Sequence, residues 1–236
     1  EKNIFRRPAM HIPQTTTAIT DPDTIVKMQK LLAALEANFE GYEKLRKKLI
    51  ALPKYGQEQE EVDMLAKRIT TDLVKSYSNY TNRFKGNGKF VVLTFVWATE
   101  AGAELGASPD GRLAGVPVAQ SVTPQSASMT KGITAAINSC ATQPYELFAG
   151  GVSSMWDIDP TWASEDVIKG LFTSYFEQGG QMFQGNTTDV EDLIKAQQNP
   201  EAYPHLIVRV GGYSARFVWL YKGCQDDVIE RYRHKS

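Results

Sequence analysis

The sequence predicts an α/β fold with parallel strand pairing, and three observations lead to this prediction. Apolar residues recur every three or four positions over Asp23–Leu52, which is typical of an amphipathic helix. The segment FVVLTFVWAT, residues 90–99, is apolar at almost every position, as in a strand buried on both faces. Further along the chain, helical and strand-like segments alternate, and this order favours strands that are joined by helices and paired in parallel.

The N-terminal part is expected to be rich in helix. Asp21 and Asp23 are suitable N-caps for the first helix, and Gly41 either dents this helix or splits it. Pro53 ends the helical pattern, since proline lacks the N–H that a helix interior needs. A second amphipathic helix is expected over 60–80.

From Gly86 onward, strands and helices are expected in turn. Gly-Asn-Gly at 86–88 marks a turn before the expected strand. Segment 104–131 is rich in turn residues and contains the turn tripeptide Pro-Asp-Gly. The later elements are expected as a helix over 133–140, a helix over 167–178, a strand within 179–188, a helix over 190–198 and a strand over 206–210.

Composition narrows the classes of function. The 236 residues carry 26 Lys and Arg against 27 Asp and Glu, so no basic field indicates a nucleic-acid partner. The longest apolar run is far shorter than the roughly 20 residues that a membrane helix needs. Cys140 and Cys224 cannot build a disulfide framework and lack the spacing of a zinc site. We therefore expect a soluble, cytoplasmic protein without nucleic-acid, membrane or metal sites.

Five blocks of the chain carry a resemblance to a known family. They are ALEANFEGYEKLRKKLIALPKYGQEQEEVDMLA (34–66), GASPDGRLAGVPVAQSVTP (106–124), KGITAAINS (131–139), FEQGGQMFQGN (176–186) and AQQNPEAYPHLIVRVGGYSARF (196–217). In this order they resemble the C-terminal region of the glycyl radical enzymes, the family that includes pyruvate formate-lyase. RVGGYSARF resembles the loop that bears the radical. Five ordered blocks make the resemblance specific, whereas a glycine pair alone would be a weak signal.

The resemblance implies a fold for the chain. The expected architecture is the C-terminal half of a ten-stranded β/α barrel of the glycyl radical enzyme type, with a helix-rich N-terminal part. Its expected parts are an irregular segment 1–22, a helical segment 23–85 and a half-barrel 86–236 with the radical loop at 205–220. Half a barrel leaves strand edges and an apolar face uncovered, so the chain is expected to need its other half.

Gly212 is the residue that the resemblance implies as the radical site. In the family, the glycine before the Tyr of this motif loses one Cα hydrogen and stores an unpaired electron, a post-translational modification that needs no bound cofactor. Glycine suits this role because a radical without a Cβ becomes planar and delocalises over the flanking amides. For the glycine pair taken alone, the alternative is a tight hairpin or bulge. The other expected loop residues are Arg209, Gly211, Tyr213, Ser214 and Arg216.

The second radical residue of the family has no counterpart in the sequence. In the family a cysteine in a Gly-Cys-x-Glu loop becomes the thiyl radical that attacks substrate, and no such motif occurs here. Cys140 is expected to be a buried structural thiol, and Cys224 is expected in a closing helix; neither is expected to carry the thiyl radical. In that closing helix we expect Val228 and Ile229 to pack, and Asp226, Asp227 and Arg231 to face solvent.

Three interpretations of the missing cysteine stay open. The chain is a C-terminal fragment, or the small subunit of a split enzyme, or a spare part that docks on an oxygen-damaged enzyme without catalysis of its own. The first two are favoured, because spare-part proteins of the family are shorter. The implied partners are a region or chain with the cysteine loop, a radical S-adenosylmethionine activating enzyme with an iron–sulfur cluster, and a small organic substrate.

The implied reaction is that of an anaerobic lyase, decarboxylase or synthase acting on a C–C or C–X bond. Departures from the dehydratase-like members, in the loop GRLAGVPVAQSVTP and in QGN followed by two Thr, favour arylacetate decarboxylation or fumarate addition. Four further residues either belong to the core or line a pocket for an aromatic or hydrocarbon substrate. They are Met155, Trp156, Trp162 and Met182.

The remaining polar candidates are expected to be structural. Asp157 and Asp159 have no third carboxylate or His nearby in sequence, so solvation and capping are expected rather than a metal pair. His11, His205 and His234 are scattered and are expected at the surface or at strand ends.

Overall fold

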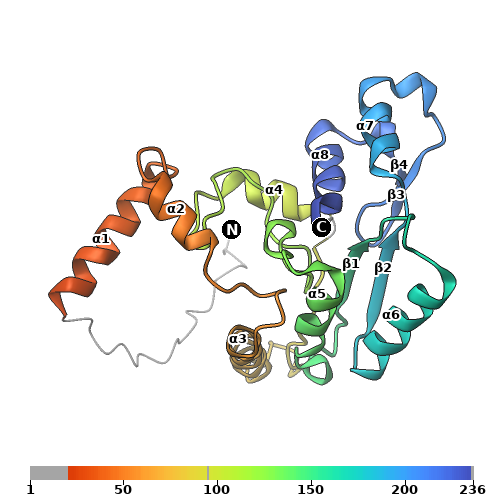
Figure 1. Cartoon of the computed structure of the whole chain (residues 1–236). Coiled ribbons are helices and arrows are strands. Elements are labelled where there is room, and N and C mark those ends of the chain that lie inside the picture. The colour runs from red at the N-terminus through yellow and green to blue at the C-terminus, as the bar shows by residue number, and fades with distance from the viewer. Residues whose placement is uncertain (1–20, 95, 235–236) are drawn as a thin grey trace, which may run out of the picture.

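The computed structural model describes residues 21–94 and 96–234, which form a helix-rich α/β structure (Figure 1). The helices are α1 (Pro22–Glu36), α2 (Glu43–Ile50), α3 (Glu60–Ser78), α4 (Trp97–Glu104), α5 (Gly132–Ala141), α6 (Glu165–Glu177), α7 (Val190–Gln198) and α8 (Lys222–Glu230). The strands are β1 (Ser153–Asp157), β2 (Met182–Asn186), β3 (Ile207–Arg209) and β4 (Ser214–Arg216). The predicted α/β class is confirmed. The half-barrel stays a prediction, because the strands of the described ranges form two separate two-stranded sheets.

The first expected helix is split at a turn around Gly41. Asn38, Phe39 and Gly41 have φ values of 48, 64 and 76°, in the left-handed region that ends helices. Phe39 is buried, so the turn carries a large side chain inward between α1 and α2. The predicted N-cap is confirmed, because the Asp21 carboxylate accepts a hydrogen bond from the Thr24 N–H at 2.8 Å.

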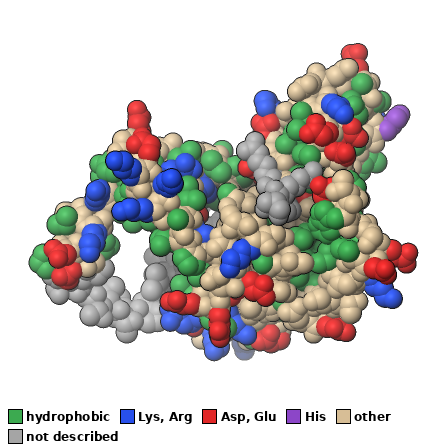
Figure 2. All heavy atoms as spheres, in the orientation of Figure 1, with side chains coloured by type: hydrophobic (Ala, Val, Ile, Leu, Met, Phe, Trp, Pro, Cys, Tyr) green, Lys and Arg blue, Asp and Glu red, His purple; other side chains and the backbone are tan. Residues whose placement is uncertain are grey.

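The two N-terminal helices keep apolar side chains at the surface. Figure 2 shows hydrophobic side chains exposed over α1, where Ile25, Val26 and Leu32 are exposed, and Lys and Arg side chains gathered nearby over α2. Exposed apolar residues in such a group are typical of a surface that another chain or segment covers.

The expected buried strand over 90–99 is wrong. Of its described residues only Val92 forms a bridge, in parallel with Val152, and α4 begins at Trp97. The Val92 N–H donates to the Gly151 carbonyl at 3.0 Å, so the start of this segment is extended beside β1 without forming a regular ladder.

Exposure explains why the segment stops short of a strand. Val91 and Leu93 are 48% and 37% exposed, whereas Phe90 and Val92 pack against the core. Continuous apolar sequence indicates burial on two faces, and only one face is covered by the described residues.

The first sheet pairs β1 with β2, with Met155 opposite Gln184, and its parallel direction agrees with the parallel pairing expected for the fold. One face of this sheet packs on α5 and α6 around Trp156 and Tyr175, which are both buried. The Tyr175 hydroxyl donates to the Met182 carbonyl at 3.3 Å and accepts from the Ser154 hydroxyl at 3.0 Å. β1 was not predicted, because SSMWD shows neither alternation nor a β-branched run.

The second sheet is the antiparallel hairpin of β3 and β4, with Arg209 opposite Ser214. It lies beside α7 and α8, at one end of the β1–β2 sheet (Figure 1). The buried residues of this cluster are Leu193, Ala196, Val208, Val210, Phe217, Cys224, Val228 and Tyr232. The predicted packing of Val228 and Ile229 is confirmed.

Two further expectations stay predictions. The division into 1–22, 23–85 and 86–236 is untested, and residues 1–20 lie outside the described ranges. No helix among the described residues is long and apolar enough to cross a bilayer. The cytoplasmic location is also untested.

We expect Trp156→Ala to lower the free energy of unfolding by about 3–5 kcal/mol, because the indole is 1% exposed and its removal leaves a large cavity. The matched control is Trp162→Ala, where the side chain is 38% exposed and the expected loss is about 1 kcal/mol or less. Urea unfolding of the two variants beside the parent chain measures both losses. Equal losses would contradict the placement of Trp156 in the core.

Candidate active site

The two adjacent glycines lie in the turn between β3 and β4. The Val210 N–H donates to the Tyr213 carbonyl at 2.9 Å and closes the turn. Gly211 is buried, Gly212 is exposed, and Gly212 has φ 80°, a conformation that residues with a Cβ rarely adopt. The glycine pair therefore does form the turn of a hairpin, the alternative considered for it. Gly212 places backbone without a side chain at the surface of the described residues.

The other predicted loop residues surround this turn. Arg209 is half-buried at the end of β3, while Tyr213 and Ser214 are exposed. The guanidinium carbon of Arg216 lies 4.4 Å from the centre of the Trp219 ring, a cation–π contact that holds the outgoing strand. The structure thus brings all six predicted residues into one hairpin.

Two side chains of β2 attach this hairpin to the first sheet. Gln184 Oε1 accepts hydrogen bonds from the Gly212 N–H at 2.6 Å and from Arg209 Nε at 2.8 Å. Asn186 binds the Arg209 backbone on both sides: its Oδ1 accepts from the N–H at 2.5 Å, and its Nδ2 donates to the carbonyl at 2.9 Å. The amide of Gln184 also donates to the Ser153 hydroxyl. Side chains, rather than a backbone ladder, join the two sheets here.

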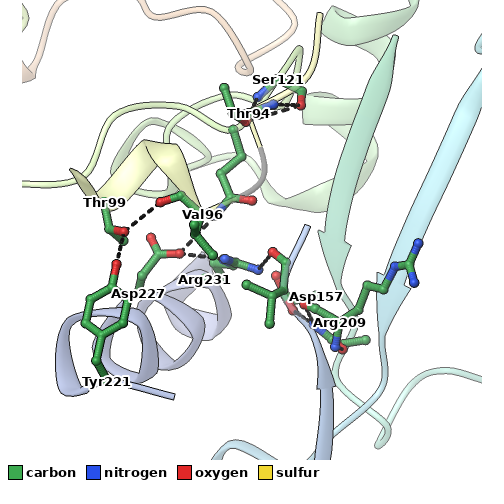
Figure 3. A network of polar contacts seen from close by, with 12 residues as sticks. Thr94, Val96, Thr99, Ser121, Asp157, Arg209, Tyr221, Asp227 and Arg231 are labelled. Atoms are coloured by element: carbon green, nitrogen blue, oxygen red, sulfur yellow. Dashed lines mark hydrogen bonds and ion pairs between the residues drawn. The ribbon is translucent and has the colours of Figure 1, made fainter. Parts of the chain in front are cut away.

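Arg231 holds the other side of the turn. Its Nη1 donates to the Val210 carbonyl at 3.2 Å, and its Nη2 forms an ion pair with Asp227 at 2.6 Å. Figure 3 shows Arg231 lying between Asp227 and Asp157. Arg231 is 5% exposed; desolvation lowers the pKa of its guanidinium, but the attraction of Asp227 and Asp157 outweighs this and raises the pKa.

The expectation that Asp227 and Arg231 face solvent is therefore wrong. The two are four residues apart on one helix face, where opposite charges pair, and the pair points at the hairpin rather than outward. Asp226 keeps the expected exposure and pairs with Lys222 at 2.8 Å.

Asp157 was expected in a solvated loop and is instead buried at the end of β1. Its Oδ1 accepts a hydrogen bond from Asn186 Nδ2 at 2.7 Å. Desolvation raises the pKa of Asp157 to about 6, although Arg231 and Asn186 lower it in part. Asp159 is not the N-cap of α6, which is Ser164; its Oδ1 instead accepts from the Thr161 N–H at 2.9 Å within a turn.

A cavity of about 790 Å³ opens between α4, α8 and the carboxyl end of β1. Met155 and Trp156 line it, whereas Trp162 and Met182 are exposed elsewhere. Glu100, Asp226 and Glu230 are among its acidic lining residues. Two of the four residues considered for a pocket thus lie at a cavity, and the other two do not.

Both cysteines are buried. Cys140 donates to the Val122 carbonyl at 3.3 Å, and burial raises the pKa of its thiol to about 12, in agreement with the expected structural thiol. Burial also raises the pKa of Cys224, which lies in α8. In the described ranges no three His, Cys, Asp or Glu side chains gather as a metal site. His205 is exposed, while His11 and the side chain of His234 fall outside the description.

Sequence reasoning missed Gln184, Asn186 and Arg231 as parts of the site. Gln184 and Asn186 were inside a recognised block, and their separation by one residue on a strand places them on the same face. This spacing is the signal that could have found them. Arg231 lies in a charged stretch, typical of a solvated helix end, and offered no comparable signal.

Comparisons with known proteins agree with this geometry. Residues 118–218 match the family model described as glycine radical, and residues 17–102 match the one described as pyruvate formate lyase-like. The chain is 33% identical over 228 residues to trans-4-hydroxy-L-proline dehydratase of Clostridioides difficile, covering 90% of this chain and 29% of that protein. It is 33% identical over 223 residues to the probable dehydratase YbiW of Escherichia coli K12, covering 89% of this chain and 28% of that protein.

A solved structure shows the same fold. The structure that describes 1,2-propanediol dehydration in Roseburia inulinivorans superposes with a TM-score of 0.83 at 35% identity, covering 89% of this chain and 28% of that chain. The chain therefore spans less than a third of the length of these three proteins.

We expect Asp157→Asn to change the pH dependence of stability. An acid whose pKa is raised from 3.8 to about 6 on folding stabilises the fold below its unfolded pKa, and this contribution is lost as pH rises through 6. Relative to Asp157→Asn, the parent chain should lose about 2 kcal/mol of unfolding free energy between pH 4 and pH 7. Urea unfolding at both pH values measures the difference. Parallel pH profiles would contradict the raised pKa.

Proposed function

Because the chain belongs to the glycyl radical enzyme family, we propose that it is the radical-storing part of an anaerobic enzyme and that Gly212 carries the radical. In this proposal the chain is a C-terminal part or split subunit, and the catalytic cysteine comes from a partner region. The observation that carries the proposal is the hairpin turn at Gly212, which lies inside the matched glycine-radical region.

The geometry of the turn suits a stored radical. Gly212 has no Cβ, so its Cα can become planar when a hydrogen atom is removed, and the unpaired electron delocalises over the two flanking amides. Its exposure gives an activating enzyme access to the Cα. The proposed activating partner is a radical S-adenosylmethionine enzyme that removes this hydrogen atom.

The partner region is proposed from what the described residues leave uncovered. The apolar residues Val91, Leu93, Trp97 and Trp219 are exposed, and so is the turn at Gly212. A radical at an exposed glycine would react with oxygen and solvent, so storage requires a cover. The same partner would bring the cysteine to Gly212, give up its S–H hydrogen atom to the Gly212 Cα and become the thiyl radical that attacks a small organic substrate.

The reaction is proposed as cleavage or formation of a C–C or C–X bond. Two of the relatives named above are dehydratases, which supports elimination at a C–X bond more than the arylacetate decarboxylation or fumarate addition favoured by the sequence departures.

Electron paramagnetic resonance tests the radical directly. After anaerobic incubation with a family activating enzyme and S-adenosylmethionine, we expect a doublet from the one hydrogen left on the Gly212 Cα. Gly212→Ala should abolish the doublet. The control is Gly185→Ala on β2, where a new Cβ would meet no heavy atom closer than 3.5 Å and the doublet should persist.

Adding candidate partners separates the proposal from its alternative. Turnover that needs a partner with a cysteine loop but no glycine loop supports a split enzyme. Rescue of an oxygen-cleaved enzyme that has its own glycine loop supports the spare-part alternative. Absence of any doublet, with the activating enzyme competent on a control protein, would contradict radical storage.

A further inference from the structure

We propose that Gln184 is the positioning residue of the radical loop, because its side chain closes the Gly212 turn onto β2 in a way that can be released. The effect of Gln184 on a radical at Gly212 rests on the proposed function, whereas the hydrogen bond between Gln184 and Gly212 does not. Gln184 is 5% exposed and reaches Gly212 from the neighbouring sheet.

The attachment of the hairpin explains why a single side chain matters. β3 pairs with β4, and β1 pairs with β2, so among the described residues no ladder of backbone hydrogen bonds joins the two sheets. Among the described residues, the hydrogen bonds between β2 and the hairpin come from Gln184 and Asn186. Asn186 binds β3 at Arg209, before the turn, and Gln184 is the β2 side chain that reaches the turn itself.

The amide of Gln184 is held in one orientation. Its Oε1 faces two donors, the Gly212 N–H and Arg209 Nε, while its Nε2 faces the Ser153 hydroxyl. Rotating the amide by 180° would place its N–H groups against both donors. The carbonyl oxygen of Gln184 is therefore fixed toward the glycine.

The hydrogen bond to Gly212 has a defined consequence for the radical. It fixes the plane of the amide on the N-terminal side of the Gly212 Cα, one of the two amides that share the unpaired electron. It also holds the turn against β2 at 2.6 Å. Gln184 thus determines how the glycine is presented when the loop is closed.

Release of the turn needs few broken contacts. On the side of β2, opening at Gly212 breaks the two hydrogen bonds to Gln184 Oε1, while both bonds from Asn186 to the Arg209 backbone can persist. On the side of α8, the Arg231 bond to the Val210 carbonyl lies before the glycines. Asn186 then serves as the anchor about which the turn moves.

Amide hydrogen exchange of the full 236-residue chain, read by NMR before any activation, tests the contact. In Gln184→Leu the Gly212 amide should exchange about tenfold faster, the effect expected from losing one well-formed hydrogen bond. Gln184→Glu keeps an acceptor for the same two donors and should stay within about twofold of the parent. The control Gln197→Leu removes an exposed side-chain hydrogen bond to Asp226 and should leave Gly212 unchanged.

The exchange of Ala196, buried in α7, reports general destabilisation in the same spectra. An equal rise at Ala196 and Gly212 in Gln184→Leu would overturn the proposal, and so would unchanged exchange at Gly212. Loss of protection in Gln184→Glu as large as in Gln184→Leu would also overturn it.

Electron–nuclear double resonance on the activated chain then tests the radical consequence. The coupling of the Gly212 amide proton should change in Gln184→Leu and return toward the parent value in Gln184→Glu. The same coupling in all three would overturn the positioning role. If the parent forms no radical, the proposed function fails, while the exchange result still decides whether Gln184 closes the turn.

Discussion

The buried guanidinium of Arg231 is the contact on which the arrangement around the hairpin depends. A buried cation is tolerated only when acceptors surround it, and Arg231 has the Asp227 carboxylate, the Val210 carbonyl and the field of Asp157. These groups belong to α8, to the hairpin and to β1. Moving any of the three away would leave a charge or a dipole unpaired in the interior, so the position of α8 determines where the hairpin can lie.

On the side of β2, two side-chain amides hold the hairpin in place. A backbone ladder between β2 and β3 would hold the hairpin more strongly, but it would also have to break as a unit for the turn to leave. Gln184 and Asn186 replace it with a few separate hydrogen bonds from alternate positions of one strand. The core that packs on the first sheet, with Trp156 and Tyr175, contains no residue of the hairpin, so the proposed opening of the turn would leave that core in place.

The sequence predicted those parts of the fold that depend on local periodicity. α3 and α7 lie where three- and four-residue spacing placed them. The six loop residues were expected from the family resemblance, and a hairpin was the alternative for the glycine pair taken alone. It failed where a distant partner decides the outcome. SSMWD forms β1 because it pairs with β2 and packs in the core. Arg231 is buried beside Asp157, a charge partner that lies far away in the sequence. A charged stretch reads as solvated unless that partner is known.

Segment 90–94 shows the opposite case, in which an expected strand does not form because its partners are missing among the described residues. Its apolar residues predict burial on two faces, and the described residues cover one of them, with Val92 against Gly151 and with Val91 and Leu93 exposed. A strand needs hydrogen-bonding neighbours as well as apolar side chains, and the edge beyond this segment has no ladder among the described residues. The chain spans less than a third of the length of the relatives named above, and the proposed partner region would supply the second covered face. Segment 90–94 lies beside β1, whereas the turn at Gly212 is held by β2, so the partner region of the proposed function would have to reach both places to cover this apolar edge and the exposed glycine.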